Sequence, residues 1–302
     1  MKNNYEYLEF LNKDYLEVVE SKEYKTGKRI CMMKDLIKRG KFITLFKKII
    51  TSIRIKKYNN NPTECKKIIN NVDISKKKIA VYTCMAGDYD YIRKPKYISD
   101  NCDYFIITDT DTHYNMLKKI PIQEEIKEKF SNNSILINRY YKTHPFELFE
   151  DYDYAIYIDS NVEIISDISK MIKNISDDYG LAFHAHSQRK CIYKEIKACK
   201  ILKKGNYKKM KMQIDRYRKE EFPTDYGMLE CNVIVSDLKN LNAIKILNDW
   251  WMEYVKSGSL RDQLALPYIL WKYDVPVDEL TGLGPNVFRN PIIRINKNHK
   301  KK

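Results

Sequence analysis

Residues 154–164, YAIYIDSNVEI, place an acidic turn directly after a very hydrophobic run. A short apolar run bounded by polar residues indicates a buried strand. Helical patterns lie between and after the strands, and the alternation predicts an α/β fold with a mostly parallel central sheet and helices on both faces. The other four predicted strands are IAVYT (79–83), DYFIITD (103–109), LAFHAH (181–186) and NVIVSD (232–237). The helical patterns cover 138–150, 166–175, 190–204, 238–256 and 260–273, with Ser259 as the expected N-cap of the last helix.

Composition narrows the class of protein. The chain has 302 residues, and 43% of them are hydrophobic, which is enough for a sizeable core and argues against a disordered chain. No window approaches the roughly 18 consecutive apolar residues of a membrane span, and the first residues do not form a signal peptide. None of the seven cysteines lies in a C-x-x-C motif. We therefore expect free thiols and a cytoplasmic protein.

The net charge of +15 is unevenly distributed along the chain. Residues 1–23 sum to −3, residues 24–78 to +14, residues 79–288 to −2 and residues 289–302 to +6. A nucleic-acid-binding protein usually carries its basic residues on a folded face with interleaved aromatic side chains. The near-neutral central part thus argues against nucleic acid as a partner. A non-catalytic nucleic-acid-binding protein that uses both basic ends stays the alternative.

The basic N-terminal part predicts an amphipathic helix over about 33–57. Such a helix either lies on an anionic membrane or packs on the body with a solvated basic face. Packing on the body is the first interpretation. Contact of residues 24–57 with an anionic membrane is the second, and it would make the protein peripheral at the inner face of the plasma membrane. The predicted organisation is an arm and linker at 1–64, a catalytic domain at 65–288 and a basic tail at 289–302.

Ligands of open α/β sheets bind beyond the carboxyl ends of the strands. The strand ends carry neither a G-x-G-x-x-G motif nor a Walker loop, which disfavours a dinucleotide-dependent dehydrogenase and a P-loop NTPase. Asp159 and Asn161 offer hard oxygen ligands that suit Mg²⁺ or Mn²⁺. Asp159-Ser160-Asn161 is equally an ordinary turn signal. Asp109-Thr110-Asp111, after the second strand, is the second choice for the metal.

Four further segments accompany the acidic turn in a characteristic order. They are NRYYKTHPFELFEDYDYAIYID (138–159), LAFHAHSQRKCIYKE (181–195), GMLECNVIV (227–235) and WWMEY…SLRDQLALPYILWK (250–272). In this order they resemble the glycosyltransferases of the domain-of-unknown-function 616 family, which is in turn similar to glycosyltransferase family 8. The resemblance covers about 79–288 and implies a type A glycosyltransferase fold. Family 8 enzymes retain the anomeric configuration, so the resemblance favours retention.

The resemblance also implies roles for individual residues. Asp262 and Gln263 would lie near the reacting anomeric carbon, and Glu230 with Asn232 would contact the donor sugar. Arg139 and Lys142 would reach the donor phosphates, although both are also typical of a solvated helix face. Asp159 and Asn161 would hold the metal. The nucleotide pocket would take Thr83, Cys84, Gly87, Asp88, Tyr89 and Asp109.

His184 and His186 alternate on one predicted strand, which places both on one face. His186 and Arg189 then form a polar exit that suits sugar hydroxyls or a phosphate. The alternative is one buried histidine and one at the surface. We expect a glycosyltransferase that moves a hexosyl unit from a nucleotide sugar, with UDP favoured, to a growing glycan or lipid-linked glycan of a bacterial surface polysaccharide. A sugar-phosphate transferase is a further alternative.

Overall fold

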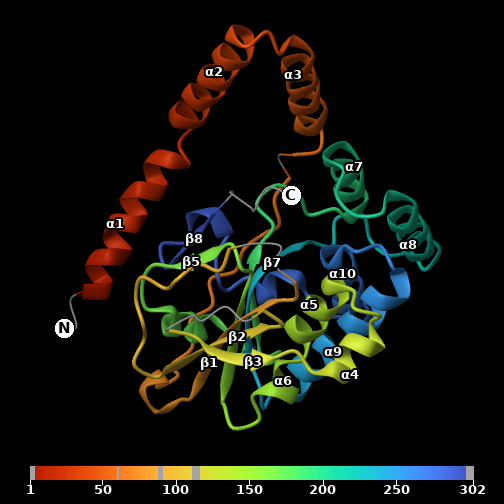
Figure 1. The fold of residues 1–302 in the computed structure, drawn as a ribbon. Coiled ribbons are helices and arrows are strands. Elements are labelled where there is room, and N and C mark those ends of the chain that lie inside the picture. Colours follow the sequence, from red (N-terminus) through yellow and green to blue (C-terminus); the bar gives the residue numbers. More distant parts are fainter. Residues whose placement is uncertain (1–3, 60, 88–90, 111–115, 297–302) are drawn as a thin grey trace.

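Strand β1 (Ile79–Met85) is buried along its whole length near the centre of a six-stranded sheet (Figure 1). The computed structural model describes residues 4–59, 61–87, 91–110 and 116–296. The strand order is β3-β2-β1-β4-β7-β6, and β1 to β4 are parallel wherever they are neighbours. The other strands of this sheet are β2 (Cys102–Thr108), β3 (Lys118–Pro121), β4 (Tyr154–Ile158), β6 (Leu181–Ala185) and β7 (Leu229–Asp237).

β7 runs antiparallel to both of its neighbours, β4 and β6. The first residues of β7 therefore lie at the edge where β1, β2, β4 and β6 end, which we call the carboxyl edge. The mostly parallel α/β class is confirmed, and all five predicted strands are present. The strands that the sequence did not reveal are β3 and a small second sheet of β5 (Val162–Ile164) and β8 (Ile293–Ile295), all short.

Two hydrophobic cores fill the two faces of the sheet. One lies between the sheet and helices α5, α9 and α10, and contains Tyr82, Tyr157 and Trp250. The other lies against a 3₁₀ helix and the β5/β8 sheet, and contains Val81, Ile156 and Val233. The helices of the body are α4 (Glu124–Lys129), α5 (Ser134–Thr143), α6 (Pro145–Leu148), α7 (Ile192–Leu202), α8 (Tyr207–Lys219), α9 (Leu241–Ser257) and α10 (Asp262–Lys272).

Three of the predicted helices differ from the structure. The pattern at 138–150 is split between α5 and α6, because Pro145 disfavours helical backbone at His144. The pattern at 166–175 forms a 3₁₀ helix, Ile168–Asn174. In the last helix Arg261 takes the N-cap position without a side-chain cap, and the expected cap Ser259 lies two residues earlier, with its hydroxyl 3.2 Å from that of Ser257.

The arm consists of three helices rather than the single predicted one. They are α1 (Asn4–Val19), α2 (Lys22–Lys38) and α3 (Phe42–Lys56). The prediction of one helix over 33–57 is wrong because the chain turns at Gly40, whose φ of +64° costs glycine no steric energy. Among the described residues, no helix combines the length and apolar character needed to cross a membrane.

The arm forms an arch that is attached to the body at both ends (Figure 1). At one end the amide of Asn12 is buried, and its Nδ2 donates to the carbonyls of Pro291 and Ile293 at 2.7 and 3.1 Å. Arg294 donates to Asn12 Oδ1 at 2.8 Å. At the other end α3 packs against α7. These contacts hold the arch in place although its middle touches little.

His184 gives the fold a dependence on pH. Burial without a charged partner lowers its pKa from 6.5 to about 3, so the folded protein keeps this imidazole neutral. The unfolded chain takes up the proton first, and this contribution to stability is lost as the pH falls from about 6.5 towards 3. We expect His184→Gln, which keeps an acceptor for Asn290, to reduce the stability difference between pH 7 and pH 5 by about 2 kcal/mol. Urea unfolding at both pH values measures it, and identical pH dependence in the parent and the variant would contradict it.

Candidate active site

Asp159 and Asn232 bring the ends of two strands together at the carboxyl edge. The Asp159 amide donates to the Asn232 carbonyl, and Asn232 Nδ2 donates to Asp159 Oδ2, both at 2.8 Å. The Tyr157 hydroxyl donates to Asp159 Oδ1 at 2.9 Å. Two of these bonds orient the carboxylate and the third fixes the backbone, while the half-buried position of Asp159 leaves it open to a ligand. The antiparallel direction of β7 makes this pairing possible.

Asn161 supplies a second oxygen near this edge. Its Nδ2 donates to the carbonyl of Asn296 at 3.2 Å, and its Oδ1 is buried without a hydrogen-bond partner among the described residues. A buried acceptor without a donor is costly and fits a cation. Mg²⁺ commonly takes only one or two protein ligands and completes its shell with water and phosphate. Asp159 and Asn161 therefore fit a divalent ion, although the described residues form no cluster of three or more acidic, histidine or cysteine ligands.

The ends of β1 and β2 are tied together by Gly87 and Asp109. The Gly87 amide donates to Asp109 Oδ1 at 2.8 Å, and the positive φ of Gly87 allows this approach. Cys84 points into the core between the sheet and the helices, so only its backbone can reach a ligand. Three of the predicted residues, Asp88, Tyr89 and Asp111, lie outside the described residues.

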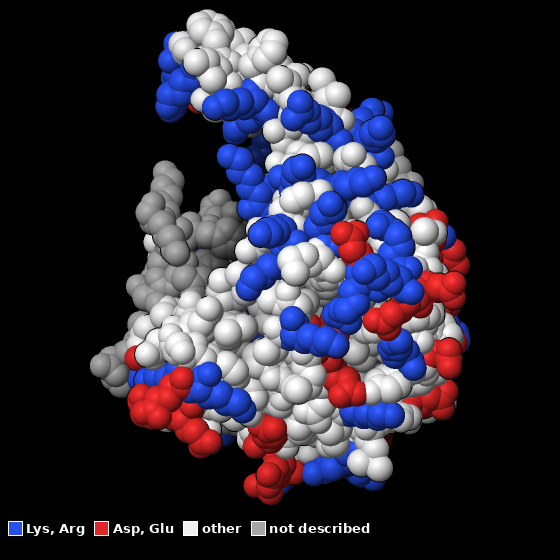
Figure 2. Space-filling view, turned by 90° about the vertical axis from the view of Figure 1, so that its right-hand side faces the viewer, with Lys and Arg blue, Asp and Glu red and all other residues white. Residues whose placement is uncertain are grey.

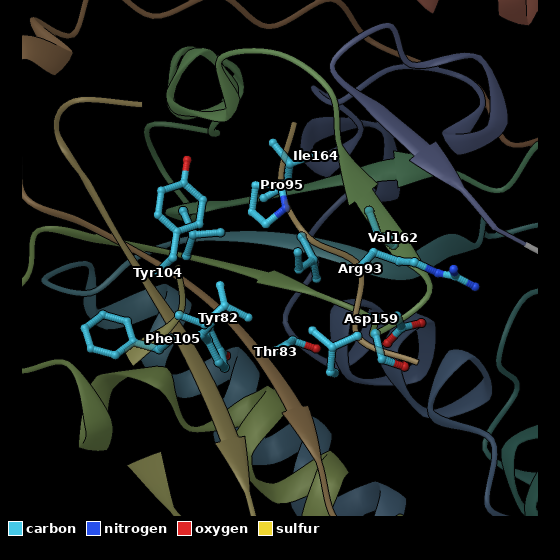
Figure 3. Close-up of a pocket in the computed structure, with 14 residues that line it drawn as sticks. Tyr82, Thr83, Arg93, Pro95, Tyr104, Phe105, Asp159, Val162 and Ile164 are labelled. Atoms are coloured by element: carbon cyan, nitrogen blue, oxygen red, sulfur yellow. The ribbon is translucent and has the colours of Figure 1, made fainter. Parts of the chain in front are cut away.

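A small pocket, with room for about one water molecule, lies beside the middle of β1 and β2, the end of β4 and β5 of the small sheet (Figure 3). Its walls are largely apolar, and its polar groups include Thr83, Asp159 and Arg93. Thr83 Oγ1 is buried and has no hydrogen-bond partner among the described residues. Tyr104 and Phe105 line the far end of the pocket. The pocket thus places a small apolar space beside the Asp159 carboxylate.

Asp262 lies in the first turn of α10. One of its carboxylate oxygens forms ion pairs with two cationic side chains of α5. Lys142 Nζ is 2.8 Å and Arg139 Nε 2.9 Å from Asp262 Oδ2. Burial opposes ionisation of Asp262, but Arg139, Lys142 and Arg261 outweigh it and hold the pKa of this carboxyl well below its usual range. Lys142 is only 2% exposed, so the alternative of a solvated helix face is wrong for it. Arg139 remains a quarter exposed and lies within electrostatic range of Asp159 as well.

Arg261 connects Asp262 and its two cations to a second set of charged side chains around Glu195. Its guanidinium donates to Glu195 Oε1 at 3.1 Å. Glu195 is buried on α7 and also accepts from Arg189 Nε at 2.5 Å. Burial opposes ionisation of Glu195, but Arg189, His186 and Arg261 lower its pKa overall. We call these groups, together with Asp262, Arg139 and Lys142, the charged cluster.

Gln263 and Glu230 form the rim of the charged cluster. Gln263 Nε2 donates to Glu230 Oε2 at 2.9 Å and to the carbonyl of Leu229 at 3.2 Å, while its Oε1 accepts from Arg261. His186 Nε2 lies 3.7 Å from Glu230 Oε1. The structure therefore brings the three predicted catalytic residues into one network with the predicted phosphate ligands.

His184 and His186 do not act as a pair. A bulge shifts the register of β6 between Ala182 and His184. His184 Nε2 contacts Asn290 at 2.9 Å, whereas His186 follows the strand and joins the charged cluster. The two imidazoles therefore do not form one binding group. Both are buried, so the alternative of one histidine at the surface is also wrong.

Sequence reasoning missed three side chains that the site uses. Arg93 comes from the loop between β1 and β2, where no pattern marks it. Glu195 lies in the predicted helix at 190–204, where no pattern singled it out, and its burial reveals its role. Arg261 directly precedes the predicted Asp262 and Gln263, and this position in the same motif could have identified it.

The α/β body of the chain is a glycosyltransferase-like domain, as its family match shows. The family model described as TOD1/MUCI70, glycosyltransferase-like domain, matches residues 54–294, and the chain belongs to this family. The sheet and the family match identify the expected type A fold. The narrower labels of the sequence analysis, domain of unknown function 616 and family 8, stay predictions. The match starts at residue 54, so α1, α2 and most of α3 lie outside it.

The solved structures that match part of the chain share little sequence with it. Mouse xyloside xylosyltransferase 1 is 11% identical over 68% of this chain and 83% of that one, with a TM-score of 0.40. The galactosyltransferase LgtC with donor and acceptor sugar analogs is 10% identical over 63% and 70%, with a TM-score of 0.36. The mannosyltransferase Ktr4p from S. cerevisiae is 10% identical over 74% of each chain, with a TM-score of 0.32. A search of curated protein sequences found no match.

The charged cluster predicts strong coupling between Asp262 and Lys142. Asp262→Asn leaves a buried ammonium without its carboxylate and should destabilise the fold by about 3–5 kcal/mol. Lys142→Met in the same chain removes that ammonium, so the double variant should be more stable than the sum of the two single changes predicts, by about 1–3 kcal/mol. Urea unfolding of the four proteins gives the coupling energy. Simple additivity would show that the pair is not coupled.

Proposed function

We propose that the protein transfers a hexosyl unit from a nucleotide sugar, with UDP as the favoured nucleotide, to a growing glycan or lipid-linked glycan. The observation that carries this proposal is the charge of the cluster. Four cations, Arg139, Lys142, Arg189 and Arg261, face the two buried carboxylates Asp262 and Glu195, with Glu230 at the rim. The excess positive charge suits an anion such as a diphosphate.

The donor then has a natural orientation. The base and ribose would lie over the mouth of the small pocket beside β1 and β2, with Thr83 from its lining and Asp109 at the end of β2 as polar contacts. The diphosphate would lie between Asp159 and the charged cluster, where Arg139 is within electrostatic range of both Asp159 and Asp262. The sugar would then face Glu230, Asn232 and the start of α10.

Asp159 and Asn161 would hold Mn²⁺ or Mg²⁺, and a bound ion there would supply positive charge opposite the diphosphate. Arg139 and Arg189 supply fixed positive charge of their own from the protein side. Positive charge that is in place before the reaction costs no reorganisation when the diphosphate gains negative charge. The cluster therefore stabilises the leaving group.

The remaining residues would position the sugar. An oxocarbenium-like transition state carries positive charge on the ring, which a nearby carboxylate stabilises. Glu230 is oriented by Gln263 and is the carboxylate at the rim of the cluster, whereas Asp262 is ionised but buried beneath it. The acceptor would be an intermediate of a bacterial surface polysaccharide.

A thermal-shift screen of UDP-, GDP- and CMP-sugars, with and without Mn²⁺, tests the proposal directly. Ligands that bind only the folded state raise its apparent stability in proportion to RT ln(1 + [L]/Kd). A UDP-sugar should give the largest shift, and Mn²⁺ should increase it. No shift with any of these donors would refute the proposal.

Asp159 should be required for transfer. Asp159→Ala removes a half-buried carboxylate rather than a core side chain, so the protein should fold while transfer falls to background. Asn161→Asp restores a second carboxylate and should tighten Mn²⁺. The matched control is Asp237→Ala, at the opposite edge of the sheet, where β7 ends. Activity of Asp159→Ala within about twofold of the parent would remove the residue from the site.

Arg139 should distinguish a diphosphate from a nucleoside. A hydrogen bond between charged groups contributes about 1.5–3 kcal/mol, so Arg139→Gln should weaken UDP binding by about 10- to 100-fold. Uridine lacks the phosphates, and its affinity should change little. Calorimetry with both ligands measures this, with the exposed Arg289→Gln as the control. Equal losses for UDP and uridine would place the diphosphate elsewhere.

A further inference from the structure

The near-neutral body conceals a strongly basic segment. Residues 190–219, which include α7 and α8, carry twelve Lys and Arg against two acidic residues, a net charge of +10. One of the two acidic residues, Glu195, is buried in the charged cluster. The outer surface of α7 and α8 is therefore almost purely cationic, and the rest of the body carries the balancing negative charge.

Helix α3 adds apolar side chains to the same region. It has four basic residues and no acidic residue, and none of its side chains is buried. Its exposed apolar residues follow helical spacing along one stripe: Phe42, Ile43, Phe46, Ile50 and Ile53, with Ile43 74% and Phe46 70% exposed. Such a stripe on a soluble surface marks an interaction site.

The two features are joined in space. α3 packs against α7, and Lys197 of α7 lies 5.9 Å from the ring of Tyr58, just beyond α3. Figure 2 shows Lys and Arg gathered on the arm and continuing onto the body on this side of the molecule. We call the exposed surface of α3, α7 and α8 the basic face.

The basic face also contains a hollow. Lys194, Lys197 and Arg218 line it, with Tyr193, Phe222 and a single carboxylate, Asp225, among the other lining residues. Arg218 lies over the Tyr193 ring at 4.9 Å. Three cations around a partly aromatic hollow suit a phosphate group with an apolar attachment.

We infer that the basic face docks on the surface of an anionic phospholipid bilayer, with the stripe of α3 inserted among the lipids. Positive charge alone would suit any polyanion. The exposed apolar stripe beside it is matched by a lipid interface, which offers negative headgroups and hydrocarbon together. A nucleic acid would leave Ile43 and Phe46 in water.

Docking in this way would orient the enzyme. α7 carries the basic face outside and Glu195 of the charged cluster inside, so one helix separates the lipid surface from the site. The site would lie close to a lipid-linked acceptor at the inner face of the plasma membrane. This last step rests on the proposed function, whereas the docking itself does not.

Sedimentation of the full chain with vesicles tests the docking. Vesicles of phosphatidylcholine with phosphatidylglycerol should bind the protein, and vesicles of phosphatidylcholine alone should bind it far less. Each basic residue near an anionic surface contributes roughly fivefold to partitioning. Lys200→Glu with Lys208→Glu, both exposed on the basic face, should therefore reduce binding by about 25-fold or more. The exposed Lys76→Glu with Lys173→Glu, away from this face, is the matched control.

The apolar stripe is tested separately. Phe46→Glu should weaken vesicle binding at high salt, where charge attraction is screened and burial of the ring dominates. Leu241→Glu removes a side chain that is 80% exposed on α9 and should have no effect. Both positions are on the surface, so both variants should fold, as circular dichroism would show.

Equal binding to neutral and anionic vesicles, or unchanged binding after charge reversal on the basic face, would overturn the inference. So would capture of RNA without binding to vesicles. These measurements contain no donor sugar, so their failure differs from failure of the proposed function, which the donor screen reports.

Discussion

The Asp262 carboxylate, held by Arg139 and Lys142 below the carboxyl edge, is the interaction on which the rest of the site depends. Burying one carboxylate alone would cost several kcal/mol, so the two cations of α5 must meet the start of α10. That requirement fixes two helices relative to the sheet. Two cations share this one carboxylate, and this excess of positive charge is the basis for the proposed diphosphate ligand.

The direction of β7 is the second constraint. In an all-parallel sheet, Glu230 and Asn232 would lie at the far edge. The antiparallel strand instead brings Asn232 to Asp159 and Glu230 to Gln263, so one strand connects the proposed metal side with the charged cluster. Most of the arm lies outside the family domain. Its helix α3 packs against α7, and the inner face of α7 carries Glu195 of the charged cluster. Surface and site are thus linked through one helix.

The sequence predicted what depends on local pattern. Apolar runs identified the five long strands, because a buried parallel strand is apolar along its length. Local pattern did not reveal partners far apart in the chain. The alternative of a solvated face for Lys142 arose because its partner Asp262 lies 120 residues away. Glu195 was not singled out, since no local pattern places it beside Arg261, 66 residues further on. The prediction of a single arm helix was wrong because Gly40 turns the chain in the middle of a continuous amphipathic pattern. The charge sum over residues 79–288 is close to zero, so it did not reveal the basic surface formed by residues 190–219.

The most direct test of the account is a crystal structure of the protein with UDP and Mn²⁺. We predict that the diphosphate lies at the carboxyl edge with a phosphate oxygen within hydrogen-bond distance of Arg139, that Asp159 faces the metal, and that the uracil lies at the mouth of the pocket lined by Thr83. A diphosphate bound elsewhere, for example in the hollow of α7 and α8, with the Asp262 cluster unchanged and remote, would contradict it.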